Sequence, residues 1–298
     1  MTHDKHPNGH PATSQTTGIQ VVENPATAAR DAALPGPFTA EGFDAAFAEI
    51  STWPGYRATP LHALPALAGS LGVTAVHYKD EAGRFGLGSF KPLGGAYAVA
   101  RALCRELERG GVAGARPSDL RTGRYADKVA AITLASATDG NHGRAVAWAA
   151  KLFGARAKIF SHDQMSEGRR AAIRDLGADL VICEGGYDDS VREAFAVAAQ
   201  NGWPVVQDTS IGAYRRVPID ITHGYGVIAH EVVSALDSPP THAIVQAGVG
   251  GVASAIAAQF WRFWGPQRPR FIVLEPTNAA CVAQSLAAGA PVTIEGDT

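Results

Sequence analysis

Short apolar runs alternate with longer segments along most of this chain. The longer segments carry apolar residues at helical spacing, whereas the runs have the length of strands. This alternation predicts an α/β fold with parallel sheets covered by helices. The predicted strands cover residues 131–135, 157–161, 179–183, 243–247 and 270–274, with a further short segment at 204–207. The predicted helices that follow cover residues 141–153, 166–176, 187–201, 251–264 and 278–288.

The first part of the chain has a less regular pattern. Thr39 is an N-cap candidate for a helix that ends at Ile50. The remaining predictions are a disordered tail over residues 1–20, a strand at 75–79, a helix from Pro92 to about Arg109, and a Gly- and Arg-rich surface loop at 110–126.

Composition narrows the class of protein. The chain carries 26 Lys and Arg against 28 Asp and Glu, a net charge of −2, which argues against a nucleic-acid binder held by bulk charge. A hydrophobic fraction of 46% excludes wholesale disorder. The length of 298 residues allows one large domain or two of medium size, with a sizeable core.

Nothing in the sequence predicts a membrane or metal partner. No apolar run approaches the roughly 18 residues that span a bilayer, and the polar start lacks the apolar region of a secretory signal. Cys104, Cys183 and Cys281 form no Cys-x-x-Cys pair, so neither a disulfide framework nor a zinc site is predicted. We expect a cytoplasmic protein.

In parallel sheets, ligands bind beyond the carboxyl ends of the strands, so the strand-to-helix loops are the candidate sites. The first such loop covers residues 84–96. Pro92 suits the first turn of a helix, which places Lys91 at the helix start. There the helix dipole predicts a lowered lysine pKa, and a neutral amine suits Schiff-base chemistry. The alternative is a solvated surface lysine.

The second loop covers residues 136–144 and also opens a predicted helix. Free N–H groups at that helix start can hold an anion such as a carboxylate. Asn141 offers both a donor and an acceptor, and Asp139 is a candidate base or anchor for an amine. The alternative is a capping loop, with either residue as a plain N-cap.

The third loop covers residues 246–252. Gly248, Gly250 and Gly251 allow the backbone to curl closely and to point N–H groups at a phosphate. The turn is neither a Walker loop nor a GxGxxG dinucleotide motif. A tight turn for helix–sheet packing is the alternative. Together, the three loops suit a phosphate-bearing aldehyde held at both ends.

The order of these loops resembles the fold type II family of pyridoxal-phosphate (PLP) enzymes, and within it the diaminopropionate ammonia-lyase branch. The resemblance runs from about residue 50 to the end of the chain. It implies two parallel-sheet α/β lobes with the cofactor in the cleft between them. The implied large domain covers residues 21–90 and 208–298, and the small domain covers 91–207. The similar segments are residues 79–98, 137–144, 207–210 and 246–251.

The resemblance also implies roles for particular residues. Lys91 would bind PLP as an imine. Asp139 would lie over the substrate, where it takes the α-proton or binds the amine, and Asp208 is a second catalytic carboxylate. Further cofactor contacts would come from Phe90 beside the ring, Asn141 to the ring hydroxyl, and Gly248, Val249, Gly250 and Gly251 to the phosphate.

The implied reaction is elimination of ammonia from 2,3-diaminopropionate to give pyruvate and ammonia, with PLP as the electron sink. Alternatives are a serine/threonine dehydratase-type lyase and an inactive PLP-binding homologue. Asp139 favours the first reading, because a dehydratase substrate has no cationic leaving group. The chain departs from the resemblance at Ile211 and Ala213, near which we expect an aromatic and an acidic residue. We also expect a homodimer, and a large domain that lacks its C-terminal part.

Overall fold

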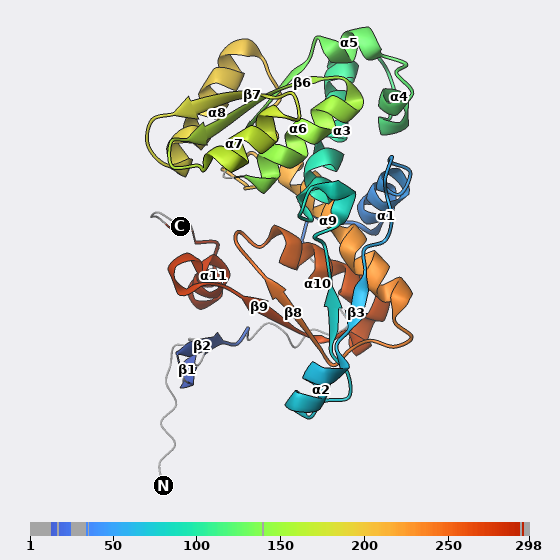
Figure 1. Cartoon of the computed structure of the whole chain (residues 1–298), viewed down its shortest axis with the longest axis vertical. Coiled ribbons are helices and arrows are strands. Elements are labelled where there is room, and N and C mark those ends of the chain that lie inside the picture. Colours follow the sequence, from blue (N-terminus) through green and yellow to red (C-terminus); the bar gives the residue numbers. More distant parts are fainter. Residues whose placement is uncertain are drawn as a thin grey trace.

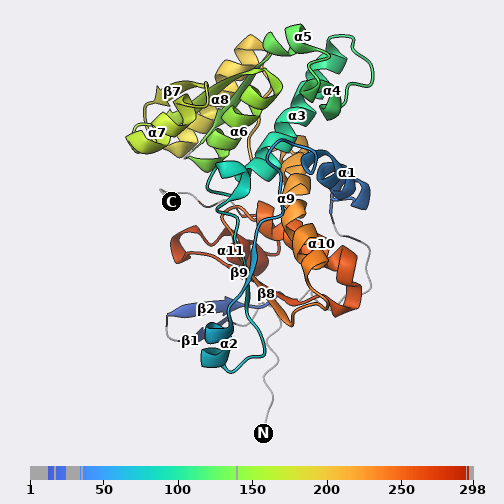
Figure 2. The same ribbon diagram turned by 45° about the vertical axis from the view of Figure 1, so that its right-hand side comes forward.

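The computed structural model describes residues 13–16, 18–24, 34, 36–138, 140–292 and 294. Two sheet regions lie at opposite ends of the molecule, with long helices between them (Figure 1). Turning the molecule by 45° keeps the same division in view (Figure 2). The α/β fold with parallel sheets predicted from the sequence is therefore confirmed.

The upper sheet contains three parallel strands in the order β5-β6-β7. Every residue of β5 is buried, as expected for a parallel strand covered on both faces. Val205 pairs with Ala135 as an isolated parallel bridge, which places the segment 204–207 at the open edge of β5. The elements are β5 (Thr133–Ala137), α6 (Asn141–Phe153), β6 (Arg156–His162), α7 (Glu167–Arg174), β7 (Asp179–Cys183) and α8 (Tyr187–Asn201).

The lower region holds a second parallel pair, β8 and β9, joined through α10. The helix predicted at 278–288 begins at Cys281, after a 3₁₀ turn. The elements are β8 (His242–Gln246), α10 (Gly251–Trp264), η3 (Gly265–Gln267), β9 (Arg270–Leu274), η4 (Thr277–Ala279) and α11 (Cys281–Ala288).

Three helices lie between the sheets: α1 (Ala40–Ile50), α3 (Lys91–Arg109) and α9 (Arg216–Ala235). The predicted cap of α1 is confirmed, since the Thr39 hydroxyl accepts a hydrogen bond from the N–H of Gly42 at 3.0 Å. Helix α9 was not predicted, because the weak helix formers Pro218, Gly224 and Gly226 interrupt its pattern.

Glycine at position 224 is required by the close approach of α9 to α3. A Cβ atom there would lie 2.2 Å from the backbone oxygen of Leu93. The reciprocal contact involves Gly94, whose Cβ would lie 2.5 Å from Cε1 of Tyr225. Side chains are absent at both positions, so the two helix backbones come together beside the start of α3.

Four short elements were not predicted in the first part of the chain. They are the hairpin partners β1 (Thr13–Thr16) and β2 (Ile19–Val22), and β3 (Leu61–Ala63) with α2 (Pro65–Leu71). Antiparallel to β3 runs β4 (His77–Lys79), which is shorter than the strand predicted at 75–79. The tail predicted over 1–20 overlaps the hairpin, and residues 1–12 lie outside the described residues.

The loop predicted at 110–126 and the strand predicted at 131–135 also need correction. The loop region contains α4 (Pro117–Arg121), and α5 (Ala126–Ala130) begins at its end. Each helix is a single turn anchored by a buried residue, Leu120 or Val129. A segment this short has no detectable periodicity and is stabilised by tertiary packing. The strand begins two residues later than predicted, at Thr133.

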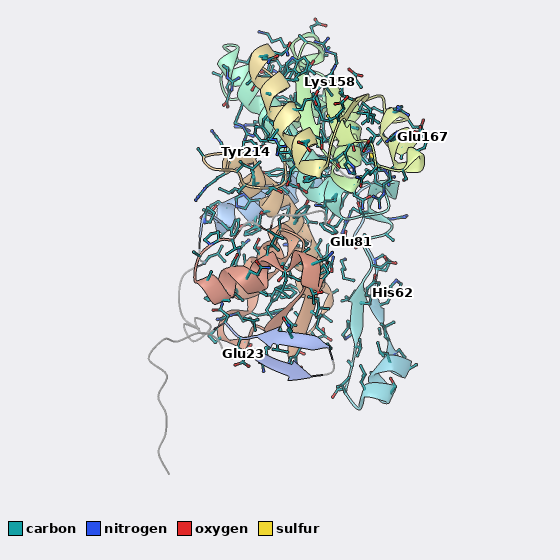
Figure 3. The ribbon with its side chains drawn as sticks, turned by 90° about the vertical axis from the view of Figure 1, so that its left-hand side faces the viewer. Glu23, His62, Glu81, Lys158, Glu167 and Tyr214 are labelled. Atoms are coloured by element: carbon teal, nitrogen blue, oxygen red, sulfur yellow. The ribbon has the colours of Figure 1, made fainter. Side chains whose placement is uncertain are left out.

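One buried cluster joins α1, α3, α6, α9 and α10, and a smaller cluster lies between β5, β6 and α8. Figure 3 shows the division from another side, with Lys158 and Glu167 in the upper region and His62 on β3 in the lower one. Among the described residues, no helix is long and apolar enough to cross a membrane.

Candidate active site

Lys91 is the first residue of α3, and Phe90 is its N-cap residue. The helix therefore begins where the sequence predicts it. The Nζ atom of Lys91 lies 2.6 Å from Oδ2 of Asp208, and the two form an ion pair. Asp208 follows the segment that pairs with β5, so both groups come from the carboxyl-end side of the upper sheet. The structure brings these two predicted catalytic residues into direct contact.

The charge state of this pair differs from the prediction for an isolated helix start. Burial lowers the pKa of Lys91, but Tyr225 and Asp208 outweigh burial and raise the pKa above its ordinary value. Burial raises the pKa of Asp208, but His142 and Lys91 together hold that pKa at about 2. The prediction of a lowered lysine pKa is therefore wrong, because a buried carboxylate at 2.6 Å outweighs the helix dipole.

The second loop places His142 beside Asp208. Its Nδ1 atom lies 3.7 Å from Oδ2 of Asp208, and its Nε2 atom bonds the backbone oxygen of Val206 at 2.9 Å. Burial lowers the pKa of His142, which therefore stays neutral at pH 7. His142 thus acts as the structural hydrogen-bonding group at the start of α6. Asn141 is exposed at the first position of the same helix.

Thr138 caps the second loop. Its hydroxyl accepts hydrogen bonds from the N–H groups of Gly140 and Gly143, each at 2.9 Å. The capping alternative for Asn141 therefore does not apply, since a neighbouring hydroxyl already bonds these N–H groups. The predicted catalytic residue Asp139 lies outside the described residues.

The third loop opens α10 with a left-handed turn. Gly250 is the N-cap residue and has a φ of +86°, which favours glycine. A Cβ at Gly248 would meet nothing within 4 Å, and Val249 is exposed. Open space in front of a glycine-rich helix N-terminus fits an anionic phosphate, because the dipole and the first N–H groups favour negative charge there. The residues present therefore fit the phosphate of PLP.

Tyr225 on α9 connects the lysine with the third loop. Its ring lies 5.1 Å edge-on from Phe90, and the Lys91 Nζ atom lies 5.9 Å from the ring centroid. On its other side, a Cβ at Gly251 would lie 3.7 Å from Cε2 of Tyr225. One aromatic ring thus lies beside three predicted residues from two of the loops, the first and the third.

The hydroxyl of Tyr225 is buried and has no well-aligned hydrogen-bond partner among the described residues. Burial raises the pKa of this phenol to about 12, so it is neutral at pH 7 and can still donate a hydrogen bond. Sequence reasoning missed Tyr225. The available signal was the pair Gly224 and Gly226 around it, because glycines within a helix indicate close packing of their neighbours.

The described residues contain no group of three or more His, Cys, Asp and Glu placed to hold a metal ion. The groups that the structure brings together are an ammonium, a carboxylate and a neutral phenol, with the glycine-rich helix N-terminus beside the phenol. These groups can hold an anion at one end, attach a carbonyl through the lysine nitrogen, and exchange protons between them.

Residues 52–298 match the protein family described as pyridoxal-phosphate dependent enzyme. Among curated proteins, the chain is 40% identical over 250 residues to diaminopropionate ammonia-lyase of Escherichia coli K12, covering 82% of this chain and 61% of that one. The namesake from Salmonella typhimurium is also 40% identical, with 62% of its length covered. The chain thus spans about three fifths of the length of these relatives.

Solved structures give the same picture. Diaminopropionate ammonia-lyase of Escherichia coli in complex with an aminoacrylate-PLP azomethine reaction intermediate superposes with a TM-score of 0.78 and 37% identity, covering 88% of this chain and 67% of that one. Threonine deaminase isoform 2 from Solanum lycopersicum superposes with a TM-score of 0.63 and 22% identity, covering 88% and 66%. The second likeness supports the fold only.

Proposed function

This chain belongs to the pyridoxal-phosphate dependent enzyme family, and from that premise we propose that it eliminates ammonia from 2,3-diaminopropionate. The net reaction takes diaminopropionate and water to pyruvate and two molecules of ammonia. The observation that carries the proposal is the Lys91–Asp208 ion pair, which lies beside Tyr225 at the start of α3. The choice of substrate follows the names of the relatives at 40% identity.

The cofactor would be held by residues from all three loops. PLP, when bound, withdraws electrons from Cα of the attached amino acid and so acidifies the α-proton. Lys91 would hold the cofactor covalently, Phe90 would pack beside it, and Asn141 would bond its ring hydroxyl. The phosphate would be held by the N–H groups of residues 248–251, at the N-terminus of α10.

Asp208 has a role that depends on Lys91. The carboxylate pairs with the lysine ammonium. If the lysine nitrogen holds the cofactor, Asp208 would lose this partner and would be free to pair with another cation. A buried carboxylate without a counter-charge suits the cationic β-amino group of diaminopropionate. Asp139, by this proposal, takes the α-proton.

Three broader features of the protein are also part of this proposal. We propose that the chain forms a homodimer in the cytoplasm. We also propose that it is divided into a large domain over 21–90 with 208–298 and a small domain over 91–207. This division is supported by the separation of the parallel sheets, because β5, β6 and β7 lie within 91–207 and β8 and β9 lie within 208–298.

Absorbance and product release test the proposal. The full chain mixed with PLP should gain visible absorbance, and Lys91→Ala should lose it and release pyruvate at least about 10³-fold more slowly. Lys158→Ala, which removes a lysine paired with Asp179 on the upper sheet, should keep both properties. A wild-type chain that gains no visible absorbance contradicts the proposal, and faster pyruvate or ketobutyrate release from serine or threonine favours the dehydratase alternative.

A further inference from the structure

We propose that Arg84 and Glu231 are positioning residues that hold the turn before Lys91 against helix α9 and so determine where the Lys91 amine lies. This inference rests on the proposed function of Lys91. It concerns a cluster of buried charges that the proposed chemistry does not use. The turn begins at the 3₁₀ segment η2 (Arg84–Gly86) and leads directly into α3.

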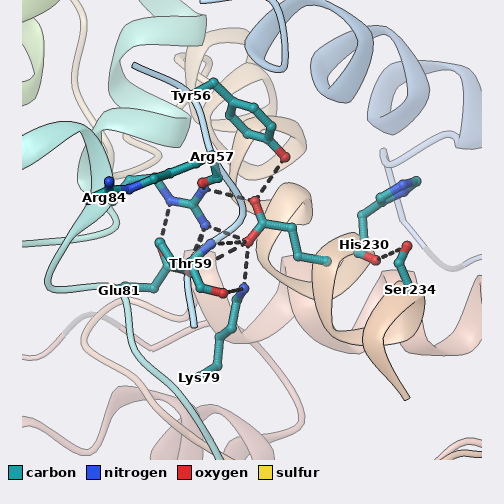
Figure 4. Close-up of polar contacts among 9 residues, drawn as sticks. Tyr56, Arg57, Thr59, Lys79, Glu81, Arg84, His230 and Ser234 are labelled. Atoms are coloured by element: carbon teal, nitrogen blue, oxygen red, sulfur yellow. Dashed lines mark hydrogen bonds and ion pairs between the residues drawn. The ribbon is translucent and has the colours of Figure 1, made fainter. Parts of the chain in front are cut away.

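Glu231 is the centre of the cluster, and its side chain is only 3% exposed. Its two oxygens accept hydrogen bonds from Nη1 and Nη2 of Arg84, each at 2.8 Å (Figure 4). The same carboxylate accepts bonds from the Tyr56 hydroxyl at 2.9 Å, the Thr59 N–H at 3.1 Å and the Lys79 ammonium at 2.5 Å. A two-point contact between a guanidinium and a carboxylate fixes both orientation and distance.

Arg84 makes a second two-point contact on its other edge. Nε and Nη2 donate to the two oxygens of Glu81, each at 2.8 Å. The Arg84 side chain is 1% exposed, so the guanidinium is enclosed by two carboxylates. With Lys79, the cluster holds two cations and two anions, and its charges balance. A buried network in this state is rigid, because any displacement leaves a charge uncompensated.

The turn itself is strained at the residue after Arg84. Phe85 has a φ of +50°, and it is the only non-glycine residue with a positive φ in the described part of the chain. Such backbone persists only where the surroundings over-determine it. The Arg84 contacts hold one side of Phe85, and the ring packs 4.9 Å from Trp148 on the other. The network therefore holds a conformation that this segment would not keep by itself.

The same helix carries both the anchor and the lining of the site. Glu231 and Tyr225 both lie on α9, and Tyr225 faces the Lys91 amine. A shift of the turn along α9 would move Lys91 relative to both Tyr225 and Asp208. Displacements of about 1 Å at a reacting group can cost about 10²-fold in rate. A change in the Arg84–Glu231 contact would therefore change the position of the Lys91 amine.

The test uses Arg84→Lys, which keeps the positive charge but cannot make both two-point contacts. We expect the dissociation constant for PLP to rise at least about 10-fold, and the pH midpoint of the visible absorbance to move. Glu81→Gln, which removes one partner of Arg84, should change both in the same direction by less. Glu81→Gln replaces Arg84→Lys in the test if Arg84→Lys does not fold.

Two controls separate positioning from a general loss of stability. Tyr56→Phe removes another bond to the same Glu231 oxygen but keeps the ring that packs beside Arg84 and Phe85, so both values should stay within about twofold. Asp220 lies on α9, as Glu231 does, and Asp220→Asn breaks its 2.7 Å ion pair with Arg105 of α3. If Asp220→Asn, at a matched loss of stability, changes the absorbance midpoint as much as Arg84→Lys does, the positioning role is overturned.

Competitive acetylation of lysines in the cofactor-free chain separates this proposal from the proposed function. Lys91 should react at least about five times faster in Arg84→Lys than in wild type, because it loses its alignment with Asp208. Unchanged reactivity in a chain that binds PLP overturns positioning and leaves the function standing. Increased reactivity in a chain that never binds PLP supports positioning and contradicts the function.

Discussion

Two buried ion clusters lie beside α9 and differ in how fully their polar groups are bonded. Around Glu231, every nitrogen of the Arg84 guanidinium donates at least one hydrogen bond. Around Asp208, the Tyr225 hydroxyl and Nδ1 of His142 have no hydrogen-bond partner among the residues described. The fully hydrogen-bonded cluster around Glu231 therefore has no donor or acceptor free to bind a ligand. The cluster with spare donors and acceptors is the one that can bind and react.

The two clusters also differ in their access to water. The Lys91 side chain is 27% exposed, whereas the Arg84 side chain is 1% exposed. A group that must meet a cofactor needs an open side, while a group that only holds the backbone is most effective when water is excluded. The difference in exposure therefore favours a structural role for Arg84 and a chemical role for Lys91, independently of the similar proteins.

The largest expected difference between the two clusters is in how much each one stabilises the fold. Glu231→Gln should lower the free energy of unfolding by about 3–5 kcal/mol, because it leaves Arg84 and Lys79 buried without their shared carboxylate. Asp208→Asn should cost less, since the Lys91 side chain is 27% exposed, but should lower activity far more. Denaturant unfolding and pyruvate release measure both. A larger stability loss in Asp208→Asn would contradict the comparison.

Two glycines with different surroundings should show the same separation between stability and binding. Gly224→Ala forces a Cβ to within 2.2 Å of the Leu93 oxygen and should cost about 1–3 kcal/mol of unfolding free energy. Gly248→Ala meets open space, so its stability should stay within about 0.5 kcal/mol of wild type. Its affinity for PLP should fall, because the added methyl group faces the phosphate. Thermal unfolding and PLP titration test the pair.

The pH dependence of stability sharpens the description of Asp208. Its pKa of about 2 lies below the ordinary value of 3.8, so the ionised carboxylate stabilises the fold by about 2 kcal/mol above pH 4. This stabilisation is lost as the pH falls from about 4 through about 2. In Asp208→Asn the acid-induced loss should be smaller by that amount. Equal acid sensitivity in the two proteins would show that Asp208 is not paired.

Tyr225→Phe should have only a small effect on stability. The hydroxyl is buried without a well-aligned partner, so its removal should change the free energy of unfolding by no more than about 1 kcal/mol. Pyruvate release should still fall, because the neutral phenol beside Lys91 is lost. Tyr97→Phe, at a buried tyrosine of α3, is the control and should leave release unchanged.

Most of the regular secondary structure could be predicted from the sequence, for a local reason. The strand–helix pairs from β5 to α11 each carry their own periodicity, and Thr39 and Pro92 are helix-start signals within a few residues of their effect. Lys91 at the start of α3 was found in the same way. Helix α9 was missed because its glycines serve a contact with α3, which no local pattern contains.

The features of the candidate site also fall into local ones and ones that depend on tertiary contacts. The three loops, the lysine at a helix start and the glycine turn that opens α10 could all be found from local sequence patterns. Folding brings Asp208 to 2.6 Å from Lys91, places Tyr225 between the lysine and Gly251, and raises the pKa of the lysine. The reason is physical: a helix start depends on neighbouring residues, whereas a buried pKa depends on charges that the fold brings together from distant positions.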